Sequence, residues 1–561
     1  MNNEALIATL TDIVGTKYCI TGDKKSERFR KGFRSGEGQA LCVVKPGTLL
    51  EQWKILQACV AADKIVIFQA ANTGLTEGST PKSSYSRDVV VINTMRMDAI
   101  HCLQGGNQVL SFPGATLFAL ERLLRPLKRL PHSVIGSSSI GASILGGVCN
   151  NSGGALCERG PAYTELALYA QVGEDGKLRL VNHLGIELGD TPEEILMRLE
   201  AGDYDKDSAA PAGKKASDTD YDAILRDVES PLPSRYNNDD RLLHEVSGCA
   251  GKLAVFAIRL DTYPQNEEER TYYIGTNNPD DITELRRRIL TEFETLPVSA
   301  EYVHRECFDI AAEYGKDTLV MIDKLGTDRL PAVFVLKGAV DARLNKFSLT
   351  RGFTDKFMQF AMRLWPQHLP KFMRDYRDRF EHHLILKMHD GGIAEAEKLL
   401  PELFEGRDDA DFMACTPREA KIAGLHRFAA AGAAVRYGHV HADQVEDILA
   451  LDIALPRNDL NWREQLPKEI TDKLVAKVYY GHMMCHVFHH DYIVKKGVDV
   501  KALKAEMLKL LDQRGIEYPA EHNVGHLYVA KEDLATHYKD CDPTNSFNPG
   551  IGRMSREKYY A

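Results

Sequence analysis

The sequence lacks the motifs of several common nucleotide-binding enzymes. No glycine-rich stretch ends in Gly-Lys-Ser or Gly-Lys-Thr, which excludes an ATP-binding P-loop. No intact Gly-x-Gly-x-x-Gly opens a helix, which argues against a Rossmann-type NAD site. We therefore expect NAD not to be a cofactor of this protein.

Signals for disulfides and for membrane-spanning segments are also missing. The 11 cysteines include no Cys-x-x-Cys pair, and their odd count argues against a disulfide framework and favours a reducing cytoplasm. The first residues show no basic stretch followed by a long apolar run, so no signal peptide is expected. No window approaches the roughly 18 uninterrupted apolar residues of a spanning helix. We expect a chain that does not cross a membrane.

The net charge of −10 is unevenly distributed. Residues 187–240 hold 15 acidic and 6 basic side chains, whereas residues 342–379 hold 9 basic and 3 acidic ones. Two oppositely charged segments in a near-neutral remainder indicate local roles, not a general affinity for nucleic acid. A DNA-binding function is suggested only by the basic segment, and we expect no nucleic-acid partner.

The length of 561 residues predicts two or three domains. Apolar periodicity in the first half indicates mixed α and β structure, with helices expected at 48–60 and 114–127 and strands at 64–68, 88–93 and 252–260. The polar stretch 202–238 predicts a long surface excursion. A charged loop at 264–270 is the expected boundary of a second domain that runs to about Gly515, and the piece after Pro519 is loop-rich.

Two glycine-rich stretches are typical of phosphate binding. The first, 70–79, directly follows the strand expected at 64–68, and the second, 136–154, holds six glycines. Glycine has no Cβ and tolerates positive φ, so backbone amides in such stretches can approach an anionic group closely. Each stretch alone could be a set of tight turns, but the pair favours a bound nucleotide.

The order of these and other motifs resembles the vanillyl-alcohol-oxidase or PCMH-type FAD-binding family. The similar segments are Val43–Cys59, Gln69–Thr80, Val89–Ile100, Gln108–Leu124, His132–Gly154, Ser247–Leu260, Glu521–His526 and Asp542–Gly550. Within that family, the forms AANTGLTEGSTP, HSVIGSS and YYGHMMCHVFHHDYIVKKG are similar to the bacterial respiratory D-lactate dehydrogenases. The resemblance covers essentially the whole chain and implies FAD as cofactor.

The resemblance also implies which residues bind the FAD. The expected pyrophosphate and flavin contacts are Ala70, Ala71, Asn72, Thr73, Gly74, Gly78, Ser79, Gly136, Ser143, Gly153 and Val255. Some family members attach the flavin covalently through His or Cys near the first glycine stretch. Here that stretch offers neither, so we expect non-covalent FAD, with Cys149 and Cys157 as the only thiols near the second stretch.

The histidines are concentrated where the chemistry is expected. Four of 19 lie in residues 481–491, and two more lie in the segment EHNVGH. A single histidine is more often structural, but this density favours a function, and imidazole titrates near pH ~6.5. Oxidation of a 2-hydroxy acid needs a cation for the carboxylate, a base for the hydroxyl proton and a flavin for the hydride.

The resemblance implies roles for three of these histidines. His522 would be the base, and His482, His489 and Glu521 would bind a divalent metal, for which two His and one carboxylate suit zinc or manganese. Two departures weaken the metal assignment. The relatives' Glu-His-Gly is Glu-His-Asn here, and the His-x6-His segment lacks the usual Asp-Gly-Asn.

The carboxylate anchor is assigned by the same resemblance. The stretch LHRFAAAGAAV, followed by DIALP at Asp452–Pro456, is similar to the family's arginine-bearing helix and Asp-x-x-x-Pro strand. This nominates Arg427, whose planar guanidinium suits a carboxylate, with Arg436 as the alternative. A surface arginine with its charge in water is the competing interpretation.

The basic segment interleaves cations with aromatic residues. In residues 355–365, Phe357, Phe360 and Leu364 recur at helical spacing, with Lys356 and Arg363 elsewhere on the helix. A basic, aromatic, amphipathic helix is typical of an anionic membrane surface. A core helix flanked by solvated lysines is the alternative. Contact with a membrane would allow electrons to pass from reduced flavin to quinone.

We therefore expect an α+β protein with a PCMH-type two-part FAD-binding domain, an antiparallel-sheet cap domain for the substrate, and a basic membrane-associating insertion. The expected bounds are 1–268 for the FAD domain, 269–324 and 386–518 for the cap, 325–385 for the membrane-binding segment, and 519–561 for a C-terminal segment that returns to the FAD domain.

The implied reaction is oxidation of D-lactate to pyruvate, with quinone as acceptor, at the cytoplasmic face of the inner membrane. One alternative is a soluble dehydrogenase or oxidase of glycolate, 2-hydroxyglutarate or an aldonic acid, which would not bind liposomes in a salt-reversible way. Another is a flavin-binding scaffold without turnover, in which changing His522 to Ala would leave flavin reduction unaltered.

Overall fold

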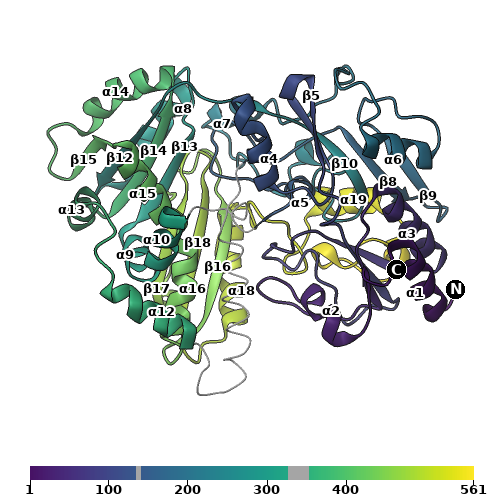
Figure 1. The fold of residues 1–561 in the computed structure, drawn as a ribbon. Helices are drawn as coiled ribbons and strands as arrows, with labels where there is room; N and C mark the ends of the chain where they lie inside the picture. Colours follow the sequence, from purple (N-terminus) through teal and green to yellow (C-terminus); the bar gives the residue numbers. More distant parts are fainter. Residues whose placement is uncertain (134–140, 326–352) are drawn as a thin grey trace.

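The structure is a computed structural model that describes residues 1–133, 141–325 and 353–561. Figure 1 shows two lobes side by side. One lobe, on the right, contains the N-terminal part of the chain and the C-terminal tail, and the other contains the middle of the chain. Both chain ends lie in the first lobe.

The N-terminal lobe holds two main sheets and a short two-stranded one. The first has the order β1-β2-β4-β3 and parallel pairing among β2, β3 and β4. The second has the order β5-β6-β10-β8-β9 and is antiparallel throughout. The strands are β1 Cys19–Ile20, β2 Cys42–Val44, β3 Ile65–Gln69, β4 Val89–Asn93, β5 Ile100–Leu103, β6 Gln108–Ser111, β7 Arg129–Leu130, β8 Ala167–Val172, β9 Leu178–Asn182, β10 Ala254–Asp261 and β11 Tyr263–Pro264.

Helices cover these sheets with apolar faces set by helical spacing. In α3 (Leu49–Ala61), Leu49, Trp53 and Leu56 are buried, and the Thr48 hydroxyl caps the first turn by accepting from the backbone N–H of Glu51. The helices and strands expected in the first half are confirmed, although the second helix begins three residues late. The helices of this lobe are α1 Asn3–Val14, α2 Asp23–Arg30, α3, α4 Leu117–Leu124, α5 Ile144–Cys149, α6 Pro192–Ala201 and α19 Glu532–Cys541.

The second lobe is built on one antiparallel sheet of seven strands, which confirms the expected antiparallel cap. Its order is β15-β12-β14-β13-β17-β18-β16. The strands are β12 Glu269–Thr276, β13 Ser299–His304, β14 His382–His389, β15 Ala410–Ala414, β16 Val445–Ala454, β17 Leu474–His482 and β18 Val487–Lys495.

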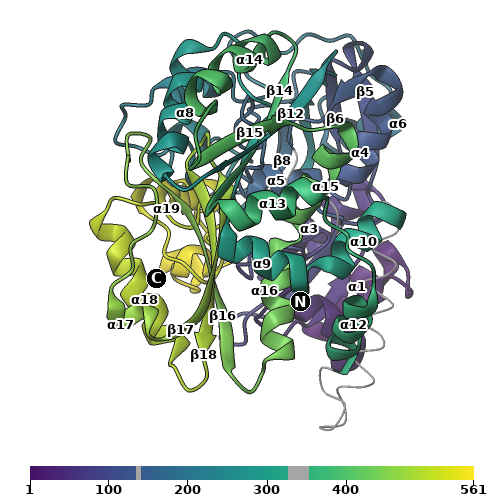
Figure 2. The ribbon, with the colours of Figure 1, turned by 90° about the vertical axis from the view of Figure 1, so that its left-hand side faces the viewer.

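Helices cover both faces of this sheet. Successive side chains of a strand point to opposite faces, and here apolar side chains lie on both. One face packs against α8 (Pro279–Glu292), α14 (Gly391–Phe404) and α18 (Val500–Gln513). The other packs against α9 (Arg305–Tyr314), α13 (Lys371–Arg379), α15 (Pro417–Phe428) and α16 (Ala430–Val440), which Figure 2 shows gathered together. The remaining helices of the lobe are α10 Lys316–Leu325, α12 Phe353–Leu364 and α17 Lys468–Thr471.

The polar stretch 202–238 corrects one expectation. It contains a short helix, α7 (Tyr221–Arg226), and Tyr221 and Leu225 are part of the core of the second lobe. Further along, the side chain of Arg235 is also buried. The prediction of a surface excursion was wrong for this part, because a few widely spaced buried residues leave no periodic signal in a polar segment.

Helix α12 turns its apolar side outward. Phe357, Phe360 and Leu364 are 56%, 63% and 74% exposed. In contrast, Asp355 and Gln359 are buried against the protein, where Asp355 pairs with Arg436. The alternative of a core helix flanked by solvated lysines is therefore wrong. Residues 326–352, where the basic segment begins, lie outside the described residues.

The C-terminal tail returns to the N-terminal lobe and completes its first sheet. The backbone N–H of Val66 in β3 donates to Ser546, and the N–H of Asn548 donates back to Val66. The buried carboxylate of Asp542 accepts from the backbone N–H groups of Ser546 and Phe547. These bonds fix the segment Asp542–Asn548 against β3, the strand that leads into the expected FAD loop.

Candidate active site

The loop after β3 forms an open, glycine-containing cradle. Asn72 and Glu77 adopt positive φ, and the Ser79 hydroxyl donates to Asn72 Oδ1 at 2.9 Å, which fixes the loop's shape. A Cβ built on Gly74 or Gly78 would meet nothing within 4 Å. Free space beside half-exposed backbone is what a bound pyrophosphate requires, so this loop fits FAD.

The other expected FAD contacts are more deeply placed. Ser143 caps α5 by accepting from the N–H of Gly146 at 3.0 Å. Val255 lies in β10 and packs in an apolar cluster, and its carbonyl accepts from Gln52 at 3.0 Å. Gly153 contacts the guanidinium of Arg235. Gly136 lies outside the described residues.

The EHNVGH segment joins the FAD cradle to the second lobe. The N–H of His526 donates to the carbonyl of Thr76 at 2.9 Å, and a Cβ on Gly525 would lie 1.9 Å from that oxygen. At the other end of the segment, the N–H of Glu521 donates to Asp452 Oδ2 at 2.7 Å. Cradle and cap therefore meet at Glu521 and His522.

His482, His489 and Glu521 converge as the resemblance implied. The Nε2 atoms of the two histidines are 3.3 Å apart, and Glu521 Oε2 lies 3.5 Å and 3.7 Å from them. One ligand atom from each residue lies within 4.8 Å of the others. Two imidazole nitrogens and one carboxylate oxygen facing a common point fit a zinc or manganese ion.

The outer nitrogen of each histidine faces a carboxylate. His482 Nδ1 lies 2.6 Å from Glu301 Oε1, and His489 Nδ1 lies 3.2 Å from Asp452 Oδ1. Such contacts fix the ring orientation and the tautomer that leaves Nε2 free to bind a metal. Glu301 belongs to no motif, so sequence reasoning missed it.

The side chains around the two histidines include more carboxylates than arginines. Burial alone would lower the pKa of His482, but the carboxylates of Glu301 and Glu521 raise it to about 10. Burial would raise the pKa of Glu521, yet Arg235 and His482 hold it well below its usual range. The carboxylates of Glu301, Asp452 and Glu521 face two arginines, Arg235 and Arg427, so one negative charge is left for the histidines or a bound cation to offset.

His522 lies at the edge of this centre and reaches solvent. Its side chain is 38% exposed, and its Nε2 is 3.9 Å from Asp452 Oδ2. Asn523, at the position where the family resemblance implies a glycine, donates to the hydroxyl of Tyr538 and accepts from the N–H of Gly525. The substitution is accommodated by these bonds and leaves His522 free to face a substrate.

Arg427 lies in the site and Arg436 does not. Arg427 Nε is 2.8 Å from Glu301 Oε2, and its guanidinium lies over the Tyr480 ring, 4.5 Å from the centroid. Arg436 is ion-paired with Asp317 and Asp355, on the α10 and α12 side of the lobe. Arg436, the alternative carboxylate anchor, is therefore held in ion pairs within the fold.

The remaining clustered histidines are structural. His486, with positive φ in the turn after β17, donates from Nδ1 to the carbonyl of Pro456 at 3.2 Å. His490 points to the opposite sheet face, beside Tyr492. Burial lowers the pKa of His490 to about 3 and that of His526 to about 4, so both are neutral at physiological pH.

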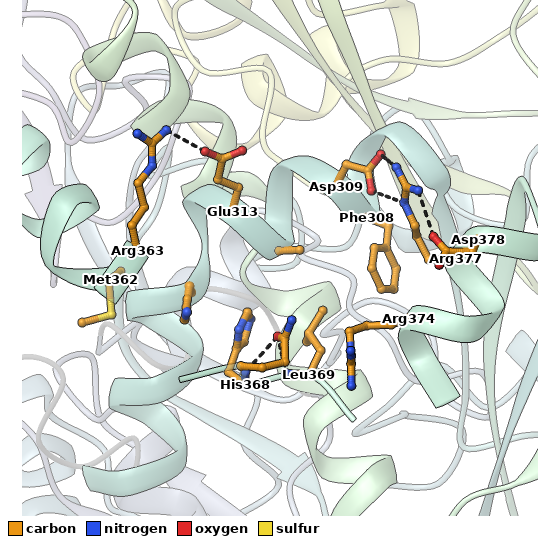
Figure 3. A pocket seen from close by; sticks show the side chains of 13 residues that line it. Phe308, Asp309, Glu313, Met362, Arg363, His368, Leu369, Arg374, Arg377 and Asp378 are labelled. Atoms are coloured by element: carbon orange, nitrogen blue, oxygen red, sulfur yellow. Dashed lines mark hydrogen bonds and ion pairs between the residues drawn. The ribbon is translucent and has the colours of Figure 1, made fainter. Parts of the chain in front are cut away.

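A separate cavity of about 520 Å³ lies between α9, α10, α12 and α13, and none of the expected site residues lines it (Figure 3). Its charged walls are largely paired: Arg377 bonds both oxygens of Asp309, and Arg363 bonds Glu313. It is a feature of the exposed helical layer.

Among the described residues, no helix has the length and apolar character needed to cross a bilayer.

Two family profiles match the chain. Residues 271–560 match the family described as D-lactate dehydrogenase, membrane binding, and residues 40–179 match the FAD binding domain. The second match contains the cradle after β3, in agreement with its geometry. FAD is therefore the cofactor of this fold.

Known proteins resemble the chain over its whole length. It is 58% identical over 559 residues to the quinone-dependent D-lactate dehydrogenase of Escherichia coli, covering 99% of this chain and 98% of that one. The protein of the same name from Haemophilus influenzae is 55% identical, with full coverage of both.

Solved structures at low identity share the fold. A 4-ethylphenol oxidase from Gulosibacter chungangensis has a TM-score of 0.59 at 11% identity, covering 98% of this chain and 96% of that one. A p-cresol methylhydroxylase has the same TM-score and identity, covering 98% and 97%. The expected PCMH-type fold is thus confirmed. With the full-length identity above, the chain belongs to the family of quinone-dependent D-lactate dehydrogenases.

Proposed function

We propose that this protein oxidises D-lactate to pyruvate at a membrane surface and passes the electrons to quinone. One observation carries the proposal: His522, Arg427 and the centre formed by His482, His489 and Glu521 meet where the cap lobe touches the FAD cradle. A base, a carboxylate anchor and a polarising centre are the groups that 2-hydroxy-acid oxidation requires beside a flavin. Membership of the family supplies the substrate and the acceptor.

The bound FAD supplies the hydride acceptor for C2 of the substrate. His522 is placed to take the hydroxyl proton, since its imidazole borders the site and remains half-buried. The nearest carboxylate is that of Asp452, whose Oδ2 lies 3.9 Å from His522 Nε2. The exposed edge of the ring lets that proton leave to water.

Arg427 is placed to bind the lactate carboxylate. Its Nε is held by Glu301 and its plane rests on Tyr480, so the guanidinium is oriented before substrate arrives. Within the described part of the chain its terminal nitrogens have no hydrogen bond to another side chain, and they remain for a bidentate carboxylate.

His482, His489 and Glu521 would hold zinc or manganese. Such an ion would polarise and acidify a substrate hydroxyl. The three side chains lie between His522, which shares the neighbour Asp452 with His489, and Arg427, which reaches His482 through Glu301.

Membrane association is assigned to α12 and its basic neighbours. The outward Phe357, Phe360 and Leu364 fit the interface of a bilayer, and the surrounding lysines and arginines fit anionic headgroups. The enzyme would lie peripherally on the cytoplasmic face, where quinone is reached from the bilayer.

The decisive test is an anaerobic absorbance spectrum of the purified flavoprotein before and after D-lactate, with L-lactate as the control. Bleaching of the flavin by D-lactate alone is expected. A yellow protein that D-lactate leaves unchanged, but that glycolate or 2-hydroxyglutarate bleaches, would contradict the substrate assignment and keep the fold.

A further inference from the structure

Residues 234–237 form a buried strap against the candidate active site. The Ser234 hydroxyl donates to the carbonyl of Cys485, in the turn between the two metal-site strands, at 2.9 Å. Asn237 Nδ2 donates to the backbone carbonyl of His522 at 2.7 Å. The strap thus contacts both the histidine hairpin and the loop that carries Glu521 and His522.

Arg235, in the middle of the strap, joins the two halves of the site. It is 1% exposed, and its Nη2 donates to the carboxylate of Glu521 and, at 2.8 Å, to the carbonyl of Gly154. A Cβ on Gly153 would lie 2.9 Å from its Cζ and Nε. A side chain at position 153 would therefore displace the guanidinium.

The two oxygens of Glu521 consequently have different partners. Oε1 is bonded to Arg235, whereas Oε2 faces the Nε2 atoms of His482 and His489 at 3.5 Å and 3.7 Å. The terminal torsion of a glutamate is broad and nearly two-fold, so a carboxylate without such a bond would rotate and lose this division.

We propose that Arg235 is a positioning residue: it holds Glu521 so that Oε2 alone faces the two histidines, and it links that carboxylate to Gly153, an expected FAD contact, and to its neighbour Gly154. The inference rests on the proposed function, because it deepens the role of the same site. Arg235 acts through Glu521, because its side chain is buried and its bonded nitrogen faces Glu521 and Gly154. Both bonds come from one nitrogen, Nη2, which is held in place because the planar guanidinium packs against Gly153. A lysine ammonium on its flexible stem would not be held at that point.

The first test measures metal affinity. The FAD-loaded R235K variant is stripped with a chelator and titrated with zinc against a chromophoric competitor. We expect zinc binding weaker by about 10- to 100-fold, the effect typical of partners that orient metal ligands. The matched control is R259K: Arg259 is fully buried, but it bonds Gln108 and the carbonyl of Leu184, remote from the site. Equal zinc affinities in R235K and R259K would overturn the proposal, whatever their melting temperatures.

The second test is a double-mutant cycle with E521Q, read as the rate of flavin reduction by D-lactate. R235K should slow reduction by about tenfold or more in the native background and by less than about twofold in E521Q. Additive effects would contradict action through Glu521. If D-lactate does not reduce the flavin of the native chain, the substrate assignment fails, and the zinc titration alone tests the role of Arg235. If the native chain binds no zinc, the double-mutant cycle alone tests that role.

Discussion

The imidazoles of His482 and His489 face each other with their Nε2 atoms 3.3 Å apart. They come from adjacent antiparallel strands, in which His482 pairs with Val487 and Tyr480 pairs with His489. Because side chains alternate along a strand, this register places both rings on one sheet face as diagonal neighbours. The six residues between them are thus a hairpin of fixed length, and a one-residue change in the turn would send one ring to the other face.

Replacing His522 by Gln should slow flavin reduction by D-lactate by about 10²- to 10⁴-fold, the usual contribution of a general base. The FAD content should stay unchanged, since His522 lies outside the cradle. Anaerobic stopped-flow absorbance measures both. The control H183Q changes a histidine paired with Glu245 on the surface of the N-terminal lobe, and a similar loss there would rule out a specific role for His522.

Removing metal should lower the rate of flavin reduction. We expect zinc or manganese to copurify in a ratio near one, and chelation to slow the reaction until either ion is restored. Elemental analysis of the wild type and of H482N and H489N makes the measurement. A chain that carries no metal and reacts at full rate after exhaustive chelation would leave these histidines with a purely structural role.

The R427K variant should raise the KM for D-lactate. Hydrogen bonds to a charged group contribute about 1.5–3 kcal/mol each, so loss of one corresponds to a rise of roughly 10- to 100-fold. Steady-state kinetics with a soluble quinone acceptor measures it. R436K, whose native arginine pairs with Asp317 and Asp355, should lower the melting temperature and leave KM unchanged, and the reverse pattern would make Arg436 the anchor.

The double variant F357S/F360S should weaken binding to anionic liposomes. Burying a phenylalanine contributes about 1.5–3 kcal/mol, so the partition coefficient should fall by roughly 10²-fold or more. Cosedimentation at low and high salt measures it, and binding of the wild type should weaken as salt screens the basic residues. L460S removes another exposed apolar side chain, and an equal loss there would point to a different surface.

Stability should fall as pH drops below about 6.5. Burial lowers the pKa of His383 and of His426 to about 3, whereas both titrate near ~6.5 when unfolded. The unfolded chain therefore binds protons first, and each such histidine removes about 1.4 kcal/mol per pH unit between these values. Urea unfolding at pH 7.5, 6 and 5 measures the slope. In H383F, whose ring would keep the contact with Phe308, the slope should be shallower, and an unchanged slope would contradict the assignment.

The sequence allowed much of the fold to be predicted, for identifiable reasons. The strand before the cradle and helix α3 have strong periodicity and capping, and motif order carried the rest of the FAD domain. His482, His489 and Glu521 were predicted because the family resemblance links them, although 38 residues lie between His482 and Glu521 and no local pattern indicates that they meet.

Arg235 and Glu301 could not be predicted in the same way. Arg235 lies in a polar stretch with no period, and its burial depends on contacts with Gly154 and Glu521 from distant parts of the chain. Glu301 is one alternating residue in an ordinary strand, and only the pairing of β13 with β17 brings it opposite His482. The positions of such residues depend on tertiary contacts and not on the local sequence pattern.

The return of the tail to β3 has a consequence for biosynthesis. Val66 obtains its last backbone partners from Ser546 and Asn548, which are synthesised long after β3. Until those residues have been made, the nascent N-terminal lobe exposes the open edge of β3, a site for mispairing with other strands. Flavin uptake should therefore follow synthesis of the segment around Asp542, and nonsense truncations shortly before Asp542 should accumulate as colourless, chaperone-bound polypeptides.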